Sequence, residues 1–455
     1  MKLWCELAWL GGERPEAGVA LEIEDDRIVT VTPGVAAPAG AEWPAEPMLF
    51  ADAERLQAAE AERDSEAIVR LPGLTLPGLA NAHSHAFQRA LRGRTHAGTG
   101  SFWPWREQMY ALAGALDPDR CFALSRATFG EMALAGITCV GEFHYVHHAP
   151  DGTPYDDPNA MGRAVLAAAA EARVRITLLD ACYLHGGIER FRDADADAWA
   201  ERVGALAERP TARVGAAIHS VRAVDPASAR TVAEWAAGRP LHAHVSEQPK
   251  ENEECLAAHG RTPTGLLADA GALSEHFTAI HATHLTDGDV DLLGGAGVTA
   301  CLCPTTERDL ADGIGPARRL LEAGAALATG SDSQAVIDPF EEARAIELDE
   351  RLATGVRGVH PATDLLRAAT TGGYAALGWP EGGRIEAGAL ADLTTVSLDE
   401  VRLAGTRAEE VVPSVVFAAA ATDVRNVMVG GRWSVRDGAH VAFDVAAELR
   451  AALTP

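Results

Sequence analysis

Two histidines separated by one residue, His83 and His85, carry the clearest chemical signal in the chain. Side chains two positions apart on a β-strand point to the same face, so both imidazoles can reach one site. Imidazole nitrogen together with carboxylate oxygen suits Zn²⁺, and Fe²⁺ or Mn²⁺ also accept these ligands. The pair therefore suggests part of a metal site, although an isolated pair of this kind is often structural.

Similar residues follow three later apolar segments. His242 and His244 repeat the spacing, with Glu247 shortly after them; His281 ends another segment, and Asp332 follows the last one. Imidazole and carboxylate groups bind divalent metals and also move protons. Four such features at the ends of successive segments favour one metal-dependent catalytic site, and we expect a hydrolase.

The apolar segments that precede these residues alternate with stretches of helical spacing, as in a chain of βα units. Eight strand-like runs are recognised, at residues 75–79, 137–140, 175–179, 214–218, 241–245, 277–280, 298–302 and 325–329. This alternation predicts an α/β fold built on a (β/α)₈ TIM-type barrel. Such barrels carry their chemistry at the C-terminal ends of the strands, where the candidate residues stand.

The two ends of the chain have a different pattern, of short β segments and turns. We therefore predict a catalytic barrel over residues 76–370 and a small β-sandwich module built jointly from residues 1–75 and 371–455. An Ala/Glu-rich stretch at residues 43–66 interrupts the first part and is interpreted as an insertion, either a short surface helix or a loop.

The net charge of −26 at pH 7 argues against a nucleic-acid or membrane-surface partner. The N-terminus lacks the apolar stretch of a signal peptide, and no apolar run approaches the ~20 residues that cross a bilayer. The seven cysteines show no disulfide-framework or zinc-ribbon spacing. We expect a cytoplasmic protein with free thiols.

A local cluster of arginines can still attract an acidic small molecule. Arg89 and Arg92 follow the first histidine pair, Arg106 stands beside two tryptophans, and Arg222 follows another strand-like run. Arginine binds carboxylates through two parallel hydrogen bonds. The pattern favours a small acidic substrate.

The runs at residues 76–85 and 383–393 resemble the amidohydrolase superfamily, and the resemblance covers nearly the whole chain. It implies four metal ligands, namely His83, His85, His244 and Asp332. It also implies that Glu247 shuttles protons and that His281 and Asp332 take part in catalysis.

The scarcity of lysine bears on the number of metal ions. Two-metal members of this superfamily usually bridge their metals with a carboxylated lysine on the fourth strand, yet the chain holds only Lys2 and Lys250, and neither stands there. We therefore expect one divalent metal per chain, with Zn²⁺ preferred. Glu142, at another strand end, is left open as a bridging carboxylate.

Within the superfamily, the chain most resembles the formimidoylglutamate deiminases of histidine degradation, in the runs 83–90, 102–106, 142–148, 219–222 and 281–284. This implies hydrolysis of the C=N bond of N-formimino-L-glutamate to N-formyl-L-glutamate and ammonia by a homodimer. It implies that Arg106 and Arg222 hold the carboxylates, and that Gln88, Tyr145 and His219 line the pocket.

The pair Arg308-Asp309 departs from that pattern at the rim. Two alternatives stay open. An aminohydrolase of a guanidine, purine, pyrimidine or s-triazine would use the same metal site, whereas a non-catalytic barrel scaffold would have lost its ligands.

Overall fold

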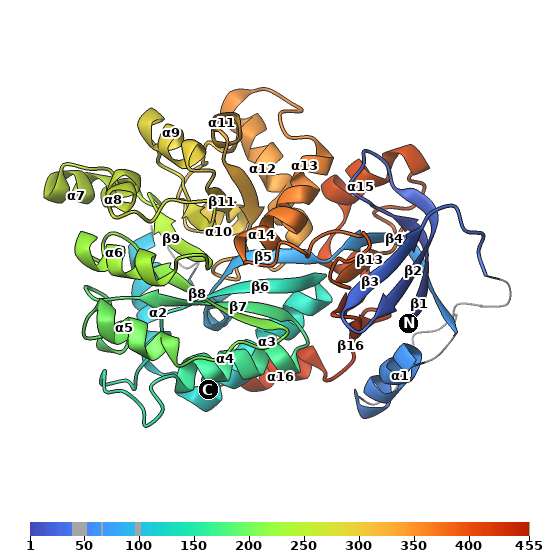
Figure 1. Cartoon of the computed structure of the whole chain (residues 1–455), viewed down its shortest axis with the longest axis horizontal. Coiled ribbons are helices and arrows are strands. Elements are labelled where there is room, and N and C mark those ends of the chain that lie inside the picture. The colour runs from blue at the N-terminus through green and yellow to red at the C-terminus, as the bar shows by residue number, and fades with distance from the viewer. Residues whose placement is uncertain (39–51, 65–66, 96–101, 455) are drawn as a thin grey trace.

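The computed structural model describes residues 1–38, 52–64, 67–95 and 102–454, and has two parts, a barrel and a smaller β module beside it (Figure 1). Among these residues, eight parallel strands form the barrel sheet. They are β5 (Leu79–Ser84), β6 (Ile137–His144), β7 (Arg175–Cys182), β8 (Ala212–Ile218), β9 (Leu241–Val245), β10 (Phe277–His281), β11 (Thr299–Leu302) and β12 (Ala326–Thr329). Each strand pairs with the next along the chain, and a bridge between Ser84 and Asp332 joins the two ends of the sheet. The predicted (β/α)₈ barrel is confirmed.

Helices surround the barrel, and several have an aspartate as the N-cap residue. Asp225 accepts hydrogen bonds from the Ala227 and Ser228 amides at the start of α6, with Pro226 in the first turn. The larger helices are α2 (Phe102–Gly114), α3 (Pro118–Leu134), α4 (Ala160–Glu171), α5 (Ala196–Gly204), α6 (Pro226–Trp235), α7 (Pro249–His259), α8 (Pro263–Asp269), α9 (Asp287–Gly295), α11 (Ala317–Ala323) and α12 (Pro339–Thr354). Shorter ones are α10 (Pro304–Asp309), α13 (Ala362–Arg367) and α14 (Gly373–Ala376).

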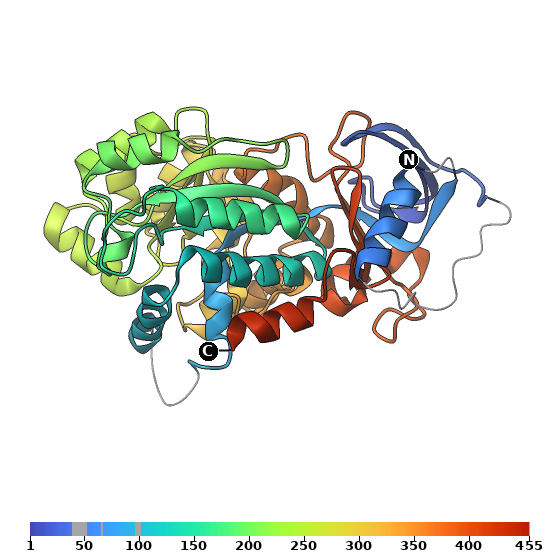
Figure 2. The ribbon, with the colours of Figure 1, turned by 90° about the horizontal axis from the view of Figure 1, so that it is seen from below.

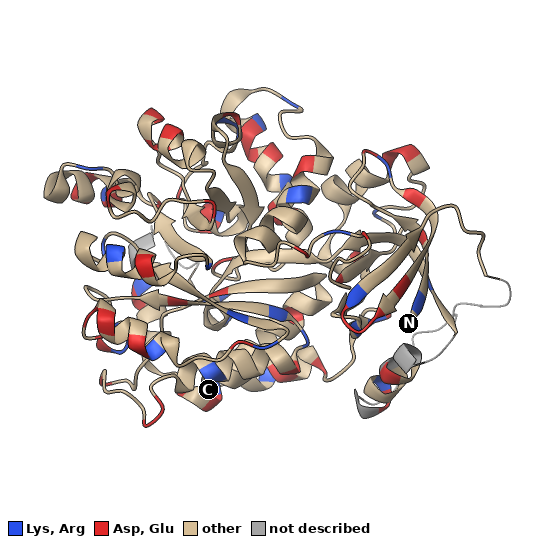
Figure 3. Cartoon of the chain, in the orientation of Figure 1, with Lys and Arg blue, Asp and Glu red and all other residues tan. Residues whose placement is uncertain are grey.

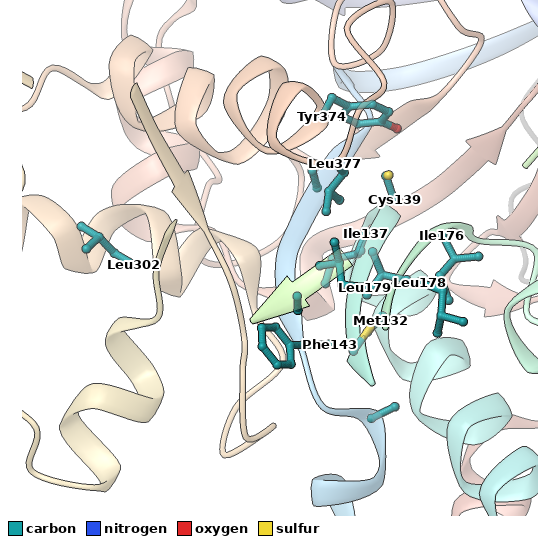
Figure 4. Close-up of a cluster of buried hydrophobic side chains, with 14 of the residues drawn as sticks. Met132, Ile137, Cys139, Phe143, Ile176, Leu178, Leu179, Leu302, Tyr374 and Leu377 are labelled. Atoms are coloured by element: carbon teal, nitrogen blue, oxygen red, sulfur yellow. The ribbon is translucent and has the colours of Figure 1, made fainter. Parts of the chain in front are cut away.

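The barrel core is built from alternating strand side chains (Figure 4). Leu178 points out of the sheet toward Gly162 of α4, whereas its neighbour Leu179 lies against Gly215 of β8. Leu377 closes the base of the barrel, and Gly141 has to be glycine there because a Cβ would lie 2.3 Å from Leu377 Cδ2. The base is thus a packed core, and the opposite mouth is left for chemistry.

Both ends of the chain share one second sheet. Its strands are β1 (Lys2–Ala8), β2 (Glu16–Glu24), β3 (Arg27–Thr32), β4 (Ile68–Pro77), β13 (Leu393–Val396), β14 (Val424–Val429), β15 (Arg432–Arg436) and β16 (Ala439–His440). β13 pairs with β4, which joins the two chain ends. The β14–β15 turn at Gly431 lies against the carbonyl of Asp25, so the sheet folds back over its own core, and the module predicted from both ends is confirmed.

Two details differ from expectation or extend it. The run at residues 75–79 is not one barrel strand: residues up to Pro77 belong to β4, and the first barrel strand starts at Leu79. Within the predicted insertion, α1 (Asp52–Asp64) is a helix, while residues 43–51 and 65–66 lie outside the described residues. The domain limits remain a prediction.

The C-terminal segment returns to the barrel. α16 (Val445–Leu453) lies along α3 (Figure 2), where Arg126 forms an ion pair with Glu448 and stacks on Phe443. α15 (Val411–Ala418) packs near α12 and α13. Acidic and basic residues are interspersed on the outer helices (Figure 3). No helix among the described residues combines the length and apolar character needed to span a bilayer.

Candidate metal centre and active site

Four predicted metal ligands meet at the barrel mouth. His83 is the penultimate residue of β5, His85 directly follows that strand, His244 lies in β9, and Asp332 follows β12. Asp332 Oδ1 is 3.2 Å from His83 Nε2 and 3.4 Å from His85 Nε2, and His244 Nε2 is 3.2 Å from His83 Nε2. Side chains up to 249 positions apart in sequence are therefore gathered around one point.

The donor set fits a divalent metal ion. The Nδ1 atoms of His85 and His244 lie 2.8 Å from the carbonyl oxygens of Phe143 and His219. A carbonyl can only accept, so Nδ1 carries the hydrogen and Nε2 turns a lone pair to the centre. The ligand separations of 3.2–3.4 Å match the edges of about 3.3–3.5 Å of a tetrahedron around Zn²⁺.

The pKa shifts of these residues also favour a metal site. Burial lowers the pKa of His83 to about 3, against the opposing hydrogen bond and charge of Asp332. Burial also lowers the pKa of His85 and His244. Burial alone would raise the pKa of Asp332, but the hydrogen bond from His83 and the surrounding imidazoles bring it below its usual range. Neutral imidazoles and an ionised carboxylate are the forms that bind metal.

The predicted proton-transfer residues border the same point. His281 Nε2 lies 3.8 Å from Asp332 Oδ2, and its Nδ1 lies 3.3 Å from Glu307 Oε1. Burial opposes the charged form of His281, but Glu307, Glu247 and Asp332 raise its pKa well above the usual value. Glu247 is 6% exposed, at the cavity wall. The structure thus brings together all three predicted catalytic side chains, Glu247, His281 and Asp332.

The strand ends that carry these residues have strained backbones. Ser246, His281 and Asp332 have φ values of 52°, 67° and 44°, which non-glycine residues rarely adopt. Each such conformation costs on the order of 1–3 kcal/mol and persists where the surrounding structure enforces it, often at functional sites. Here these backbone conformations occur at the C-terminal ends of β9, β10 and β12, at the mouth of the barrel.

A cavity of ≈ 130 Å³ lies above the ligands. All five predicted substrate-binding residues line it: Gln88, Arg106, Tyr145, His219 and Arg222. Gln88 Nε2 donates to Tyr145 Oη at 2.9 Å, while Gln88 Oε1 is buried without a hydrogen-bond partner among the described residues. The amide oxygen is therefore available to a donor in the cavity.

Two guanidinium groups border the cavity, those of Arg106 and Arg222. Arg222 Nη2 lies 3.4 Å from Glu247 Oε2 and its Nε lies 3.7 Å from Glu251 Oε1. Arg106, on α2, stacks over the ring of Tyr110 at 5.5 Å. Both charges are in place to meet anionic groups.

Other residues singled out from the sequence have structural partners instead. Arg89 and Arg92 both pair with Glu131 at 2.6 Å, which removes them from the substrate site. Arg308 pairs with Glu341 and does not line the cavity. Glu142 accepts hydrogen bonds at 2.7 Å from Ser84 Oγ and from the Ala86 amide. Both oxygens of its carboxyl group are therefore bonded to residues at the end of β5 and just after it.

Sequence reasoning missed three residues of the site. Glu307 orients His281, Glu251 approaches Arg222, and Tyr183 lines the cavity. Glu251 is buried, at 1% exposure, although it stands in a run of charged residues. A buried acid in an otherwise solvated run leaves no mark in the sequence alone.

Known proteins resemble the chain over most of its length. A formimidoylglutamate deiminase from Pseudomonas aeruginosa is 37% identical over 83% of the chain and 88% of its own length. A 5-methylthioadenosine/S-adenosylhomocysteine deaminase from Halobacterium salinarum is 33% identical over 82% of the chain and 84% of its own length. The crystal structure of an amidohydrolase from Brucella melitensis matches with a TM-score of 0.85 and 30% identity, covering 99% of this chain and 98% of that one.

A family model points the same way. The model described as the amidohydrolase family matches residues 74–434, which include the barrel and every side chain of the metal centre. The chain therefore belongs to the amidohydrolase family.

Proposed function

We propose that this amidohydrolase-family enzyme is a deiminase with one zinc ion that hydrolyses the C=N bond of N-formimino-L-glutamate, giving N-formyl-L-glutamate and ammonia. The observation that carries the proposal is the pair Arg106 and Arg222, which borders the cavity above the metal ligands. An amidine substrate with two carboxylates calls for two such groups, because guanidinium binds carboxylate through paired hydrogen bonds. The similarity to a formimidoylglutamate deiminase supports the choice of substrate.

The ligand set His83, His85, His244 and Asp332 would hold the metal. Three imidazoles and one carboxylate suit Zn²⁺, and the absence of a lysine on the fourth strand favours a single ion. A divalent metal held there would lower the pKa of a water molecule to ~7 and so make a nucleophile available at neutral pH.

The chain's own residues then move protons. Asp332 and His281 lie next to each other, so Asp332 Oδ2 accepts the proton of the attacking water and His281 Nε2 donates a hydrogen bond to orient it. Glu307 holds the His281 ring in place through Nδ1. Glu247, on the same wall, takes the proton of the newly added hydroxyl and delivers it to the departing nitrogen, so that the C–N bond breaks as the C=O bond forms and ammonia leaves.

Substrate orientation follows from the cavity lining. Arg222 stands beside Glu247, so a carboxylate bound there brings the substrate close to the proton donor. Gln88 Oε1 can accept an N–H of the formimino group, since it has no hydrogen-bond partner among the described residues. Tyr145 fixes the Gln88 amide in the required orientation through its hydroxyl.

Ammonia release from a substrate panel tests the proposal. We expect kcat/KM for N-formimino-L-glutamate to exceed the values for guanine, adenosine, 5-methylthioadenosine, cytosine and an s-triazine amine by at least ~10³-fold, because only the first matches two guanidinium groups. Higher turnover of any ring substrate would overturn the proposed substrate. Failure of every substrate with metal-loaded protein would overturn the proposed reaction.

A further inference from the structure

The first and last strands of the barrel share fewer backbone contacts than the other neighbouring strands do. β11 and β12 pair at four positions, whereas β12 and β5 are joined by the single bridge between Ser84 and Asp332. Two backbone hydrogen bonds support this bridge, from the His85 amide to Asp332 and from the Asp332 amide to His83, each at 3.0 Å. Three of the four metal ligands thus sit where the barrel has least backbone pairing.

Buried polar side chains replace the missing ladder. We call them the seam; its members are Asn81, Ser84, Glu142, Ser331 and Gln334, each at most 3% exposed. Asn81 exchanges two hydrogen bonds with Ser331, at 2.6 and 2.9 Å. The seam therefore ties β5 and β6 to the segment after β12.

Gln334 is the central member. Its Nε2 donates to Ser84 Oγ at 2.9 Å and to the Asp332 carbonyl at 2.8 Å, and its Oε1 accepts from Ser331 Oγ at 2.8 Å. One amide thereby connects the residue between the two histidine ligands with the backbone of Asp332, the carboxylate ligand. Gln334 has φ of 62°, so its position is enforced against backbone preference.

The hydroxyl of Ser84 is held from both sides. It accepts from Gln334 and donates to Glu142 Oε2 at 2.7 Å, while Glu142 Oε1 accepts from the Ala86 amide at 2.7 Å. Each hydrogen of the chain Gln334–Ser84–Glu142 has one acceptor, so the direction of every bond is determined. The His83–His85 segment cannot shift relative to Asp332 without breaking this chain.

We propose that Gln334 and Ser84 are positioning residues for the metal centre, which set metal affinity by fixing Asp332 against His83 and His85. Metal ligands need to be placed within ~0.5 Å, and the groups that orient them typically change affinity by about 10–100-fold. The inference rests on the metal centre of the proposed function and is independent of its substrate.

Zinc affinity of the full chain tests the inference. The zinc-loaded wild type, Gln334→Met and Ser84→Ala are titrated with a chromogenic zinc chelator, and thermal unfolding is followed for each. Met keeps the size of Gln334 but forms none of its hydrogen bonds, and Ser84→Ala is the milder variant if Gln334→Met does not fold. We expect the Kd for zinc to rise about 10–100-fold in each folded variant, with kcat recovered at saturating zinc.

A control at the other end of the barrel separates positioning from stability. Tyr374 is fully buried and its hydroxyl lies 2.7 Å from both Thr138 Oγ1 and Asp392 Oδ2. Tyr374→Phe should lower the unfolding temperature with a zinc Kd within twofold of wild type. If Ser84→Ala and Gln334→Met also keep the wild-type zinc Kd, the seam serves the fold alone and the inference is wrong. A wild type that binds no zinc overturns it together with the metal centre, whereas zinc binding without deiminase activity overturns only the proposed reaction and its substrate.

Discussion

Arg222 and Glu247 share a contact on the cavity wall, with Nη2 of the arginine 3.4 Å from Oε2 of the glutamate. The cation assigned to the substrate and the carboxylate assigned to proton transfer are therefore neighbours. A substrate carboxylate that binds Arg222 competes with Glu247 for its hydrogens, which couples binding of an acidic substrate to the release of the proton-transfer group.

Glu247→Gln separates the proton-transfer role from the metal site. The amide keeps the shape of the side chain but cannot carry the proton, so kcat should fall about 10²–10⁴-fold, with an unchanged zinc content. Initial rates of ammonia release and metal analysis measure both quantities. A kcat near that of the wild type would remove Glu247 from the reaction.

Arg222→Ala should mainly weaken substrate binding. A hydrogen bond to a charged group contributes about 1.5–3 kcal/mol, so KM for N-formimino-L-glutamate should rise roughly 10–100-fold. Arg261→Ala is the matched control, since it removes an exposed ion pair with Asp269 and should leave KM unchanged. Equal KM values for the two variants would show that Arg222 does not bind the substrate.

The metal ligands could be predicted from sequence because the fold brings residues at strand ends together. Parallel strands of a barrel bring their C-terminal ends to one rim, so His83, His244 and Asp332 at strand ends predict a shared site. The arginines could not be sorted in the same way. Arg89 and Arg106 look alike in sequence, and only the partner Glu131, 42 positions from Arg89, shows that the first is structural.

Contacts between loops far apart in sequence could not be predicted either. Glu307 orients His281 across 26 positions, and Gln334 meets Ser84 across 250. Nothing in the local spacing marks such pairs, because they depend on how the barrel strands are paired, β10 with β11 for the first pair and the last strand with the first for the second. The same holds for the run at residues 75–79, whose apolar character fits either sheet.

Zinc removal should abolish activity reversibly. Dialysis against a chelator removes the ion, and one equivalent of zinc per chain should restore full ammonia release, because the donor set describes one tetrahedral site. A metal that binds only the folded chain also stabilises it, by about 4 kcal/mol at a thousandfold excess over Kd. Full activity that requires two equivalents would contradict a single-metal centre.

Arg190 does not line the cavity, but we expect it to affect substrate affinity indirectly, through the position of α2. It is fully buried and donates to the carbonyls of Ala113 and Leu116, at 2.5 and 2.7 Å, and to that of His148 at 2.7 and 3.0 Å. These bonds hold the end of α2, the helix that carries Arg106.

Arg190→Lys can satisfy only part of this set, so α2 should shift. We expect KM to rise roughly tenfold with a smaller change in kcat, as for a lost binding contact. Circular dichroism and zinc content confirm that the variant is folded. An Arg190→Lys variant that is folded and zinc-loaded but has the wild-type KM would show that α2 is held by other contacts.

Arg202 should make stability depend on pH in a specific direction. Its guanidinium bonds Asp180 and Asp193 at 2.8–3.0 Å, and all three groups are buried. Burial alone would raise the pKa of both carboxyls, but Arg202 and, for Asp193, His148 bring the pKa of each below its usual range. The pair therefore stabilises the wild type above pH ~4, the unfolded pKa, and this stabilisation is lost only as the pH falls below it.

Arg202→Met reverses this dependence. Burial then acts without the cation, the folded pKa of both carboxyls rises above ~4, and their ionisation opposes folding as the pH increases. His147 Nε2 lies 3.8 Å from Asp180 Oδ1 and His148 Nε2 lies 3.5 Å from Asp193 Oδ1, so these two imidazoles also face the carboxyl groups. The variant should be about 3–5 kcal/mol less stable than wild type at pH 8 and lose less at pH 5.5. Unfolding temperatures of both proteins at the two pH values measure the difference, and an equal loss at both would show that unpaired carboxylates are not its cause.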